Sequence, residues 1–355
     1  MPADPDLAPV ADRRAAADRY DLRRVHPLLG FGTASDRYAA WIGQVYPEDR
    51  WAAEVKTRTK RLGGKSFEER LLPVASVGDY FEHFGVLELD FTFYRPFVEK
   101  DGKEGPSLFN LRQYAEHAPD DARFLLKAPQ AFSARVVRQG SKGNVSFEEN
   151  PDYLDAAGYR ERFLEPAKAA LGDRLAGVIF EQEYGRVAET PPPDAFVAEL
   201  ARFFDDVPDD VPTHLEVRSG HLVVPQYTDW LRERGLGLCF SHWTWLPALR
   251  EQWAWAGERF TEKHGTAVLR LLNPREMKYA AAFAKAYPFT QPVPALAETP
   301  QAWQMVNEAA ALQHQAVAHG VRLDTIANNR AWGNSPDLAR TLANRFLDFA
   351  DKRGT

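Results

Sequence analysis

Cysteine is almost absent from this chain, because Cys239 is the only one among 355 residues. A single thiol cannot form an intramolecular disulfide, and it cannot build a metal site made of several thiolates. Cys239 also lies inside an apolar run, which predicts a place within a strand and gives no support to a cysteine nucleophile. This cysteine usage suits a reducing compartment.

Long apolar runs are missing as well. The first 25 residues carry Asp and Arg throughout and contain no apolar stretch of the roughly 7–15 residues that a signal peptide needs. No segment approaches the ~18–20 apolar residues of a transmembrane helix. We therefore expect a cytoplasmic protein that has no membrane partner.

An excess of basic residues is the third absence. Lys and Arg total 44 against 50 Asp and Glu, so the net charge is -6. The chain lacks the overall positive field that draws non-specific nucleic-acid binders to phosphate. A local basic groove remains open to the chain, so nucleic acid is not excluded as a partner, and the oligomeric state is not determined.

Several cofactor and catalytic motifs are also missing. The chain has no GxxxxGK or GxGxxG phosphate loop, no GxSxG nucleophile elbow and no HExxH pair. The side chains that could ligate a metal come from scattered positions, so we expect no resident cofactor and no metal site. These side chains are Glu88, Glu181, His214, Glu216 and His242.

Short apolar runs of strand length recur along the chain, and helical patterns fall between most of them. Alternation of this kind predicts parallel strands joined by crossover helices, and eight repeats favour a closed barrel over an open sheet. We therefore predict an α/β fold, a TIM-type (β/α)₈ barrel. The predicted strands are Leu28–Thr33, Val86–Asp90, Phe124–Lys127, Gly177–Phe180, Thr213–Val217, Leu236–Phe240, Ala267–Leu271 and Leu323–Asn328.

The barrel is predicted to be a single domain over residues 26–352 with extended loops, preceded by an N-terminal helical arm over residues 1–25. Its last helix is the best marked, because Asn334 or Ser335 can cap it and Pro336 stands at the first helical position. The predicted helices are Leu111–His117, Tyr153–Leu171, Asp194–Phe204, Val224–Arg234, Arg275–Ala286, Thr299–His319 and Pro336–Asp351.

Side-chain parity indicates which strand residues face the barrel axis. Side chains alternate across a strand, so the apolar set of each strand faces the helices and the intervening residues face the axis. Leu87 and Leu89, for example, take the outer face and leave Glu88 inside. The axis-facing polar set predicted in this way is Glu88, Asp90, His214, Glu216, Arg218 and Arg270.

The C-terminal ends of the strands are the predicted site, because barrel enzymes carry their active sites there. Glu88 and Glu216 are the acid–base candidates, and Lys127 is a further catalytic candidate if burial lowers its pKa. Lys127, Arg218 and Arg270 would hold the negative charge of a ligand. The alternative is an internal salt-bridge network that only holds the barrel together.

The C-terminal end of the barrel also offers a candidate anion site, in the loops after the seventh and eighth strands, where barrels often hold phosphate. The alternative is a well-capped surface helix with no ligand. The polar residues in these two loops, among them the candidate ligand-binding residues Asn328 and Asn329, are Arg270, Asn273, Arg275, Asn328, Asn329, Arg330 and Asn334.

Three connections are longer than a minimal barrel needs. Phe97–Phe109 and Val136–Asn150 are polar and Gly-containing, which predicts mobile loops. The stretch Ser241–His264 instead holds four tryptophans, at positions 243, 245, 253 and 255. Such rings stack on a sugar ring or a base, form a lid, or pack beneath their own loop or into an oligomer contact.

Seven segments, in the same order along nearly the whole chain, resemble the YecE-like proteins, domain-of-unknown-function family 72. They read GFGTA (30–34), W-x₄-YP (41–47), LELDFTFYRP (87–96), FLLKAP (124–129), LEVRS (215–219), VLRLLN (268–273) and IANNRAWGNSP (326–336). The resemblance implies a TIM-type barrel with no established activity. It also adds Tyr94 as a ligand-binding candidate. The residues that fall on characteristic positions of the family are Glu88, Thr92, Phe93, Tyr94, Lys127, Glu216, Arg218, Arg270, Asn328 and Asn329.

The chain departs from the family pattern at several positions. Asp90 stands where members usually show Asn, the segment after the fourth strand reads FEQEY, and SGHL follows the Glu and Arg of the fifth strand. This is therefore a divergent branch. Two functions remain: a metal-independent enzyme acting on a small polar ligand that is anionic or sugar-like, and a non-catalytic barrel that binds a ligand, a nucleic acid or a protein.

Overall fold

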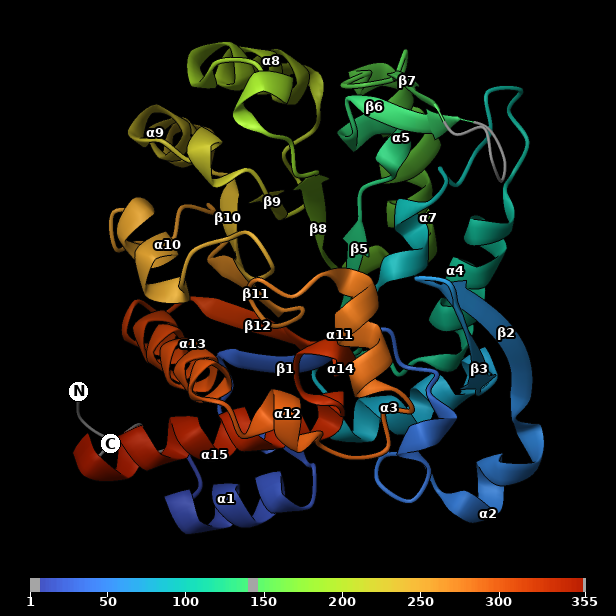
Figure 1. Ribbon diagram of the computed structural model, residues 1–355, viewed down its shortest axis with the longest axis vertical. Helices are drawn as coiled ribbons and strands as arrows, with labels where there is room; N and C mark the ends of the chain where they lie inside the picture. Colours follow the sequence, from blue (N-terminus) through green and yellow to red (C-terminus); the bar gives the residue numbers. More distant parts are fainter. Residues whose placement is uncertain (1–6, 140–145, 354–355) are drawn as a thin grey trace.

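The computed structural model describes residues 7–139 and 146–353. Within them, eight parallel strands close into a barrel in the order β1-β12-β11-β10-β9-β8-β5-β4 (Figure 1), so the predicted TIM-type fold is confirmed. All eight predicted strands are present. Their bounds are β1 (Leu29–Ala34), β4 (Val86–Leu89), β5 (Phe124–Lys127), β8 (Leu175–Gln182), β9 (Thr213–Val217), β10 (Gly237–His242), β11 (Thr266–Leu271) and β12 (Arg322–Ala327).

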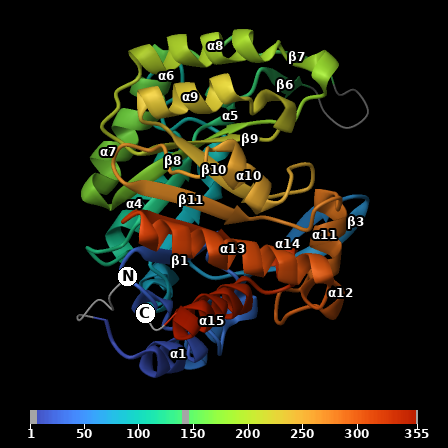
Figure 2. The same ribbon diagram turned by 90° about the vertical axis from the view of Figure 1, so that its left-hand side faces the viewer.

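Helices form a ring around the barrel, and the short helices α11 and α14 lie over the end at which the strands finish (Figures 1 and 2). None of the described helices is long and apolar enough to cross a membrane. The bounds are α1 (Val10–Asp18), α2 (Glu48–Trp51), α3 (Val77–His83), α4 (Pro106–His117), α5 (Gln130–Ser133), α6 (Ala156–Tyr159), α7 (Glu165–Leu171), α8 (Pro193–Asp206), α9 (Pro225–Arg234), α10 (Leu249–Trp255), α11 (Tyr279–Ala286), α12 (Pro294–Ala297), α13 (Pro300–Ala318), α14 (Asn329–Trp332) and α15 (Ser335–Arg353).

The barrel has two separate apolar layers, and they follow the predicted parity. Leu87, Leu89 and Leu269 belong to the large layer between strands and helices. Val86 and Val268 belong to a small layer inside the barrel, which also contains Cys239. One correction concerns Asp90, because β4 ends at Leu89 and Asp90 begins a 3₁₀ turn that runs to Phe93.

The last helix begins as its sequence predicts. Asn334 is fully buried, and its Oδ1 accepts the backbone N–H of Asp337 at 2.8 Å, which makes Asn334 the N-cap of α15. The same side chain exchanges hydrogen bonds with Gln44 and donates to the carbonyl oxygen of Phe289 at 3.0 Å. The N-terminus of α15 is therefore closed by the chain's own groups. At the other end of the chain, α1 packs along α15 (Figure 2), with an ion pair between Arg14 and Asp348.

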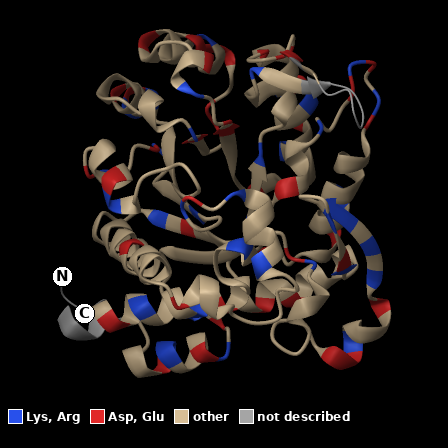
Figure 3. Ribbon diagram, in the orientation of Figure 1, with Lys and Arg blue, Asp and Glu red and all other residues tan. Residues whose placement is uncertain are grey.

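Two antiparallel hairpins lie outside the barrel. The hairpin formed by β2 (Lys56–Leu62) and β3 (Lys65–Leu71) was not predicted. It packs on α11 through Phe67, whose ring centre lies 5.0 Å from that of Phe283. Strand β2 carries a row of cations (Figure 3). The stretch predicted as the mobile loop Val136–Asn150 holds β6 (Val136–Gln139) and β7 (Ser146–Glu149), while residues 140–145 lie outside the described residues. The many charged residues of β2 and β3, KTRTKRL and KSFEERL, hid the first hairpin, because these strands lack an alternating apolar pattern.

The predicted helix Tyr153–Leu171 is interrupted. It begins only at Ala156, and a π-helical segment, Arg160–Leu164, separates α6 from α7. The wider turn leaves the carbonyl oxygen of Arg162 free to accept the N–H groups of Phe97 at 2.9 Å and Val98 at 3.1 Å. This irregularity therefore anchors the start of the loop after β4.

The N-terminal end of the barrel is filled by a histidine that needs a glycine opposite. A Cβ on Gly237 would lie 2.2 Å from Nδ1 of His214, whose Nε2 is 3.3 Å from Oγ1 of Thr266. We expect Gly237→Ala to lower the free energy of unfolding by about 1–3 kcal/mol, because the ring has to shift in a packed core. Urea denaturation at pH 7 measures this.

Gly78→Ala in α3 is the matched control. The nearest atom to its added Cβ is the carbonyl oxygen of His117 at 3.5 Å, an ordinary contact. Alanine is the better helix former by about 1 kcal/mol, so this variant should be as stable as the wild type or more stable. If the free energy of unfolding falls equally in the two variants, the contact between residue 237 and His214 is not tight.

Candidate functional site

Arg270 is the centre of a buried ion-pair network inside the barrel. From β11, its Nε and Nη2 donate to the two carboxylate oxygens of Glu88 on β4, at 2.8 and 2.7 Å. Its Nη1 donates to Oε2 of Glu216 on β9. Glu88 and Glu216 are fully buried and Arg270 is 3% exposed. The structure thus brings the predicted trio together across the barrel.

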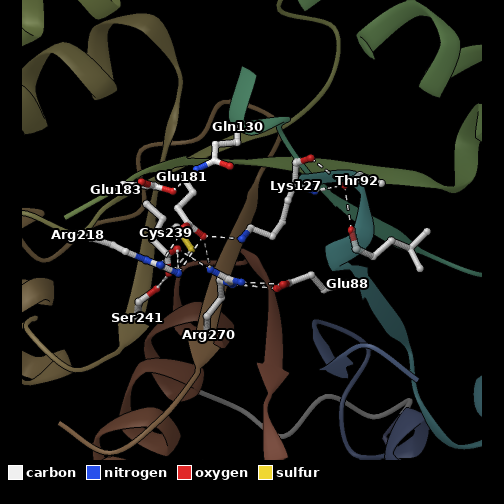
Figure 4. A network of polar contacts seen from close by, with 12 residues as sticks. Glu88, Thr92, Lys127, Gln130, Glu181, Glu183, Arg218, Cys239, Ser241 and Arg270 are labelled. Carbon is white, nitrogen blue, oxygen red and sulfur yellow. Dashed lines mark hydrogen bonds and ion pairs between the residues drawn. The ribbon is translucent and has the colours of Figure 1, made fainter. Parts of the chain in front are cut away.

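Glu181 on β8 gathers two further cations above this trio. Lys127 Nζ lies 2.7 Å from its Oε2, and Arg218 Nη1 lies 2.8 Å from its Oε1. Arg218 also donates to Glu216 at 3.2 Å, and Arg270 approaches Glu181 to 3.6 Å. Figure 4 shows Lys127 and Arg218 reaching Glu181 from opposite sides. The network therefore joins β4, β5, β8, β9 and β11.

Uncharged residues hold the charged ones in place. Thr92, in the turn after β4, accepts the backbone N–H of Lys127 at 2.9 Å, and the Phe93 ring lies 3.8 Å from Lys127 Nζ. Ser241 donates its hydroxyl hydrogen to Glu216. Gln252 of α10 fixes Ser241 through both its backbone N–H and its carbonyl oxygen, at 3.0 and 2.8 Å. These contacts restrict where each charge can move.

The electrostatics favour the charged forms of Glu181 and Arg270. Burial raises the pKa of Glu181, but Arg218, Lys127 and Arg270 outweigh burial and hold that pKa well below its ordinary value. Burial lowers the pKa of Arg270, yet Glu216 and Glu88 raise it well above normal. Burial, with the charge of Glu216, raises the pKa of the Cys239 thiol. Glu181 is therefore a carboxylate at neutral pH, and Cys239 is an uncharged thiol.

The loop after β12 supplies a cation of a different kind. Arg330 of α14 lies with its guanidinium carbon 4.4 Å from the ring centre of Tyr279. Its Nε is buried and has no hydrogen-bond partner among the described residues. Burial lowers the pKa of Arg330, and the positive charges of Arg218 and Arg270 lower it further. Arg330 is thus close to the network but is not paired with it.

The two candidate asparagines before Arg330 have structural contacts. Asn328 Oδ1 accepts the backbone N–H of Arg330 at 3.1 Å and caps α14. Asn329 Oδ1 accepts the N–H and the hydroxyl of Ser335, at 2.8 and 3.0 Å, while its Nδ2 is buried without a partner among the described residues. Both asparagines therefore shape the turn that presents Arg330.

Exposed aromatic rings surround this end of the barrel. Tyr94, the fifth candidate ligand-binding residue, is 71% exposed, and desolvation together with the charge of the nearby Asp90 raises its pKa to about 12. The four tryptophans of the 241–264 stretch divide into two pairs. Trp253 and Trp255 pack against the core, whereas Trp243 and Trp245 lie beside Tyr184 at the ends of β10 and β8.

The two histidines among the candidate metal ligands lie at opposite ends of the barrel. His214 lies at the N-terminal end of the barrel and His242 at the C-terminal end of β10. Burial lowers the pKa of His214 to about 4 and that of His242 to about 3, so both are neutral. The described part of the chain contains no group of three or more His, Cys, Asp or Glu residues placed to hold a metal ion.

Sequence reasoning named Glu181 but ranked it below Glu88 and Glu216. The structure shows that Glu181 contacts more cations than either of them. Sequence reasoning also did not predict that Ser241 binds Glu216 or that Gln252 holds Ser241 in place. Strand parity offered a signal for Ser241, which follows Cys239 by two residues in β10 and so faces the axis with it.

The family "Protein of unknown function DUF72" matches residues 30–352 of the chain. Two solved structures are similar. A DUF72 family protein of Enterococcus faecalis is 15% identical, with 90% of this chain and 95% of that chain covered and a TM-score of 0.53. One of Thermotoga maritima is 14% identical, with 90% and 99% covered and a TM-score of 0.51. No curated protein matches the chain.

Proposed function

The chain belongs to the family of proteins of unknown function DUF72, and we propose that in this member the C-terminal face of the barrel binds a small ligand through an anionic oxygen group such as a phosphate or a carboxylate. The observation that carries the proposal is Arg330, a cation close enough to the ion-pair network for Arg218 and Arg270 to lower its pKa, and without a carboxylate partner among the described residues. The face itself is where barrels of this type place their ligands.

An unpaired, half-buried cation is costly to the folded protein, because desolvation of a charge is not offset by a partner. Arg330 is such a cation, and its guanidinium group contacts the ring of Tyr279. Lys127, Arg218 and Arg270 all form ion pairs with Glu88, Glu181 or Glu216, whereas Arg330 forms no ion pair with any carboxylate in the described part of the chain. A bound anion would supply the missing negative charge.

Arg218 is the second group suited to the ligand. Its two Nη groups bind Glu181 and Glu216, but its Nε is buried and has no hydrogen-bond partner in the described part of the chain. Its side chain is 17% exposed, the largest value in the network. We therefore place the anionic oxygens of the ligand between Arg218 and Arg330, because guanidinium groups bind phosphate and carboxylate strongly.

Metal-independent catalysis on the bound ligand is the second candidate. It is favoured by the convergence of carboxylates and cations from five strands at this face. Glu88 and Glu216 are its acid–base candidates, and Lys127, which is 7% exposed, is the third. Because Arg270 and Ser241 already occupy the oxygens of Glu88 and Glu216, a reaction at those carboxylates requires the network to open.

Arg330→Gln tests the binding proposal. We expect the dissociation constant for inorganic phosphate, measured by isothermal titration calorimetry, to rise by about 10-fold or more, since a hydrogen bond to a charged group contributes about 1.5–3 kcal/mol. In the absence of phosphate, the same variant should melt at a higher temperature than the wild type, because an unpaired, half-buried charge has been removed.

The control is Arg232→Gln on α9, which removes one positive charge from an exposed ion pair with Asp229. It should leave phosphate binding unchanged. Phosphate binding by Arg330→Gln that equals the wild type, or a wild-type protein that does not bind phosphate at millimolar concentration, would contradict the proposal.

A further inference from the structure

Two aromatic side chains at the rim are exposed although each is large and apolar. Tyr184, after β8, is 48% exposed, and Trp245, after β10, is 47% exposed. Their ring centres are 5.9 Å apart with an angle of 36° between the planes. The pair therefore presents a broad aromatic surface to solvent at the C-terminal face of the barrel.

Both rings stand on anchored segments. Gly185, next to Tyr184, donates its N–H to Oγ of Ser219 at 2.9 Å. Thr244, next to Trp245, donates its hydroxyl to the carbonyl oxygen of Met277 at 2.8 Å, and its own carbonyl oxygen accepts the N–H of Glu276 at 2.9 Å. The backbone that carries the two rings is thus held in place before any ligand arrives, which lowers the entropic cost of binding.

The aromatic surface continues to the cations of the proposed anion site. The ring of Trp243 lies 6.3 Å from that of Tyr184, and the guanidinium carbon of Arg218 lies 4.7 Å from the centre of the Trp243 ring. Arg218 is therefore both the end of the aromatic surface and a member of the cationic group that includes Arg330. A ligand that spans them needs a flat apolar part and an anionic part.

We propose that the ligand is a phosphate ester that carries a planar heteroaromatic ring, of the nucleoside monophosphate class, with the ring against Tyr184 and Trp245 and the phosphate between Arg218 and Arg330. This inference rests on the proposed function. A bare sugar phosphate fits less well, because Glu181 and Glu216, the carboxylates that would accept hydrogen bonds from sugar hydroxyls here, are already bound by Arg218, Lys127 and Arg270.

The test compares adenosine 5′-monophosphate with ribose 5-phosphate, which has the same sugar and phosphate but no heteroaromatic base. We expect adenosine 5′-monophosphate to bind the full chain about 10-fold more tightly in calorimetric titrations, the gain typical of one base stacked on an aromatic side chain. The double variant Tyr184→Ala Trp245→Ala should bind both compounds as the wild type binds ribose 5-phosphate. Phe109→Ala on α4, which removes another exposed aromatic ring, is the control and should keep the preference.

The outcomes separate the two proposals. If both phosphate compounds bind equally and Arg330→Gln weakens both, the ring proposal is overturned while the anion site stands. The ring proposal is also overturned if the double variant keeps the wild-type preference. If neither compound nor inorganic phosphate binds, the proposed function itself is wrong.

Discussion

Arg270→Met is expected to lower the free energy of unfolding by about 3–5 kcal/mol, because it leaves the buried carboxylate of Glu88 without a counter-charge and Glu216 with Arg218 alone. Glu88 and Glu216 are both fully buried, and Arg270 supplies three hydrogen bonds to them. Methionine fills a similar volume, so the loss comes from charge and hydrogen bonding. Urea denaturation at pH 7, with thermal melting as a second measurement, gives the value.

Two further variants test whether the loss of stability arises because the charges of this network are buried. Arg112 forms a comparable bidentate pair with Glu104, at 2.6 and 2.7 Å, but both side chains are more than half exposed. Arg112→Met should therefore leave stability unchanged within error. The triple variant Glu88→Gln Glu216→Gln Arg270→Met removes all the buried charges of the trio and should recover at least half of the loss. If Arg270→Met is as stable as Arg112→Met, the network does not hold the barrel.

Glu181→Gln is expected to change how stability depends on pH. The folded-state pKa of Glu181 is held below the ordinary value of 4.5, so its contribution is fully present above that pH and is lost as the pH falls. At pH 7 the variant should be less stable than the wild type by about 2 kcal/mol or more, since Lys127 and Arg218 lose their shared partner. The difference should shrink between pH 4.5 and pH 3.

Glu183→Gln, two residues away, is the control, because the pKa of Glu183 is shifted in the opposite direction. Burial and the charge of Glu181 raise the pKa of Glu183, while Gln130 donates a hydrogen bond to it at 2.8 Å. A carboxyl whose folded-state pKa is raised loses its contribution as the pH rises, so Glu183→Gln should be at least as stable as the wild type at pH 7. Parallel pH profiles for the two variants would show that Glu181 is not held by the cations.

The barrel could be predicted because its physical signal is local. Apolar residues at alternating positions mark a strand with one face toward helices, and this rule correctly assigned Leu87 and Leu269 outward and Glu88 and Arg270 inward. The hairpin β2–β3 carried a different signal that was overlooked. Gly63 and Gly64, both at positive φ, join two seven-residue strands, which is the turn that favours a tight hairpin.

The position of the candidate site followed from the same rule, but its pairing did not. Parity places Arg270, Glu216 and Glu88 in one interior without saying that Arg270 binds Glu88 through two nitrogens and Glu216 through the third. Those choices depend on side-chain conformations across the barrel. The isolation of Arg330 is likewise a property of the folded chain, since nothing around it in sequence distinguishes a paired arginine from an unpaired one.

The cations of β2 have one more consequence. Within the described residues β2 pairs only with β3, so its other side offers free backbone N–H and C=O groups to any extended chain. Lys56, Arg58, Lys60 and Arg61 lie along that strand (Figure 3), and Glu69 of β3, which pairs with Arg58 and Lys60, offsets only part of their charge. A second copy docking strand against strand would bring these like charges within about 5 Å of one another. Mutual repulsion therefore protects concentrated protein against edge-to-edge aggregation, and this protection weakens as salt is added.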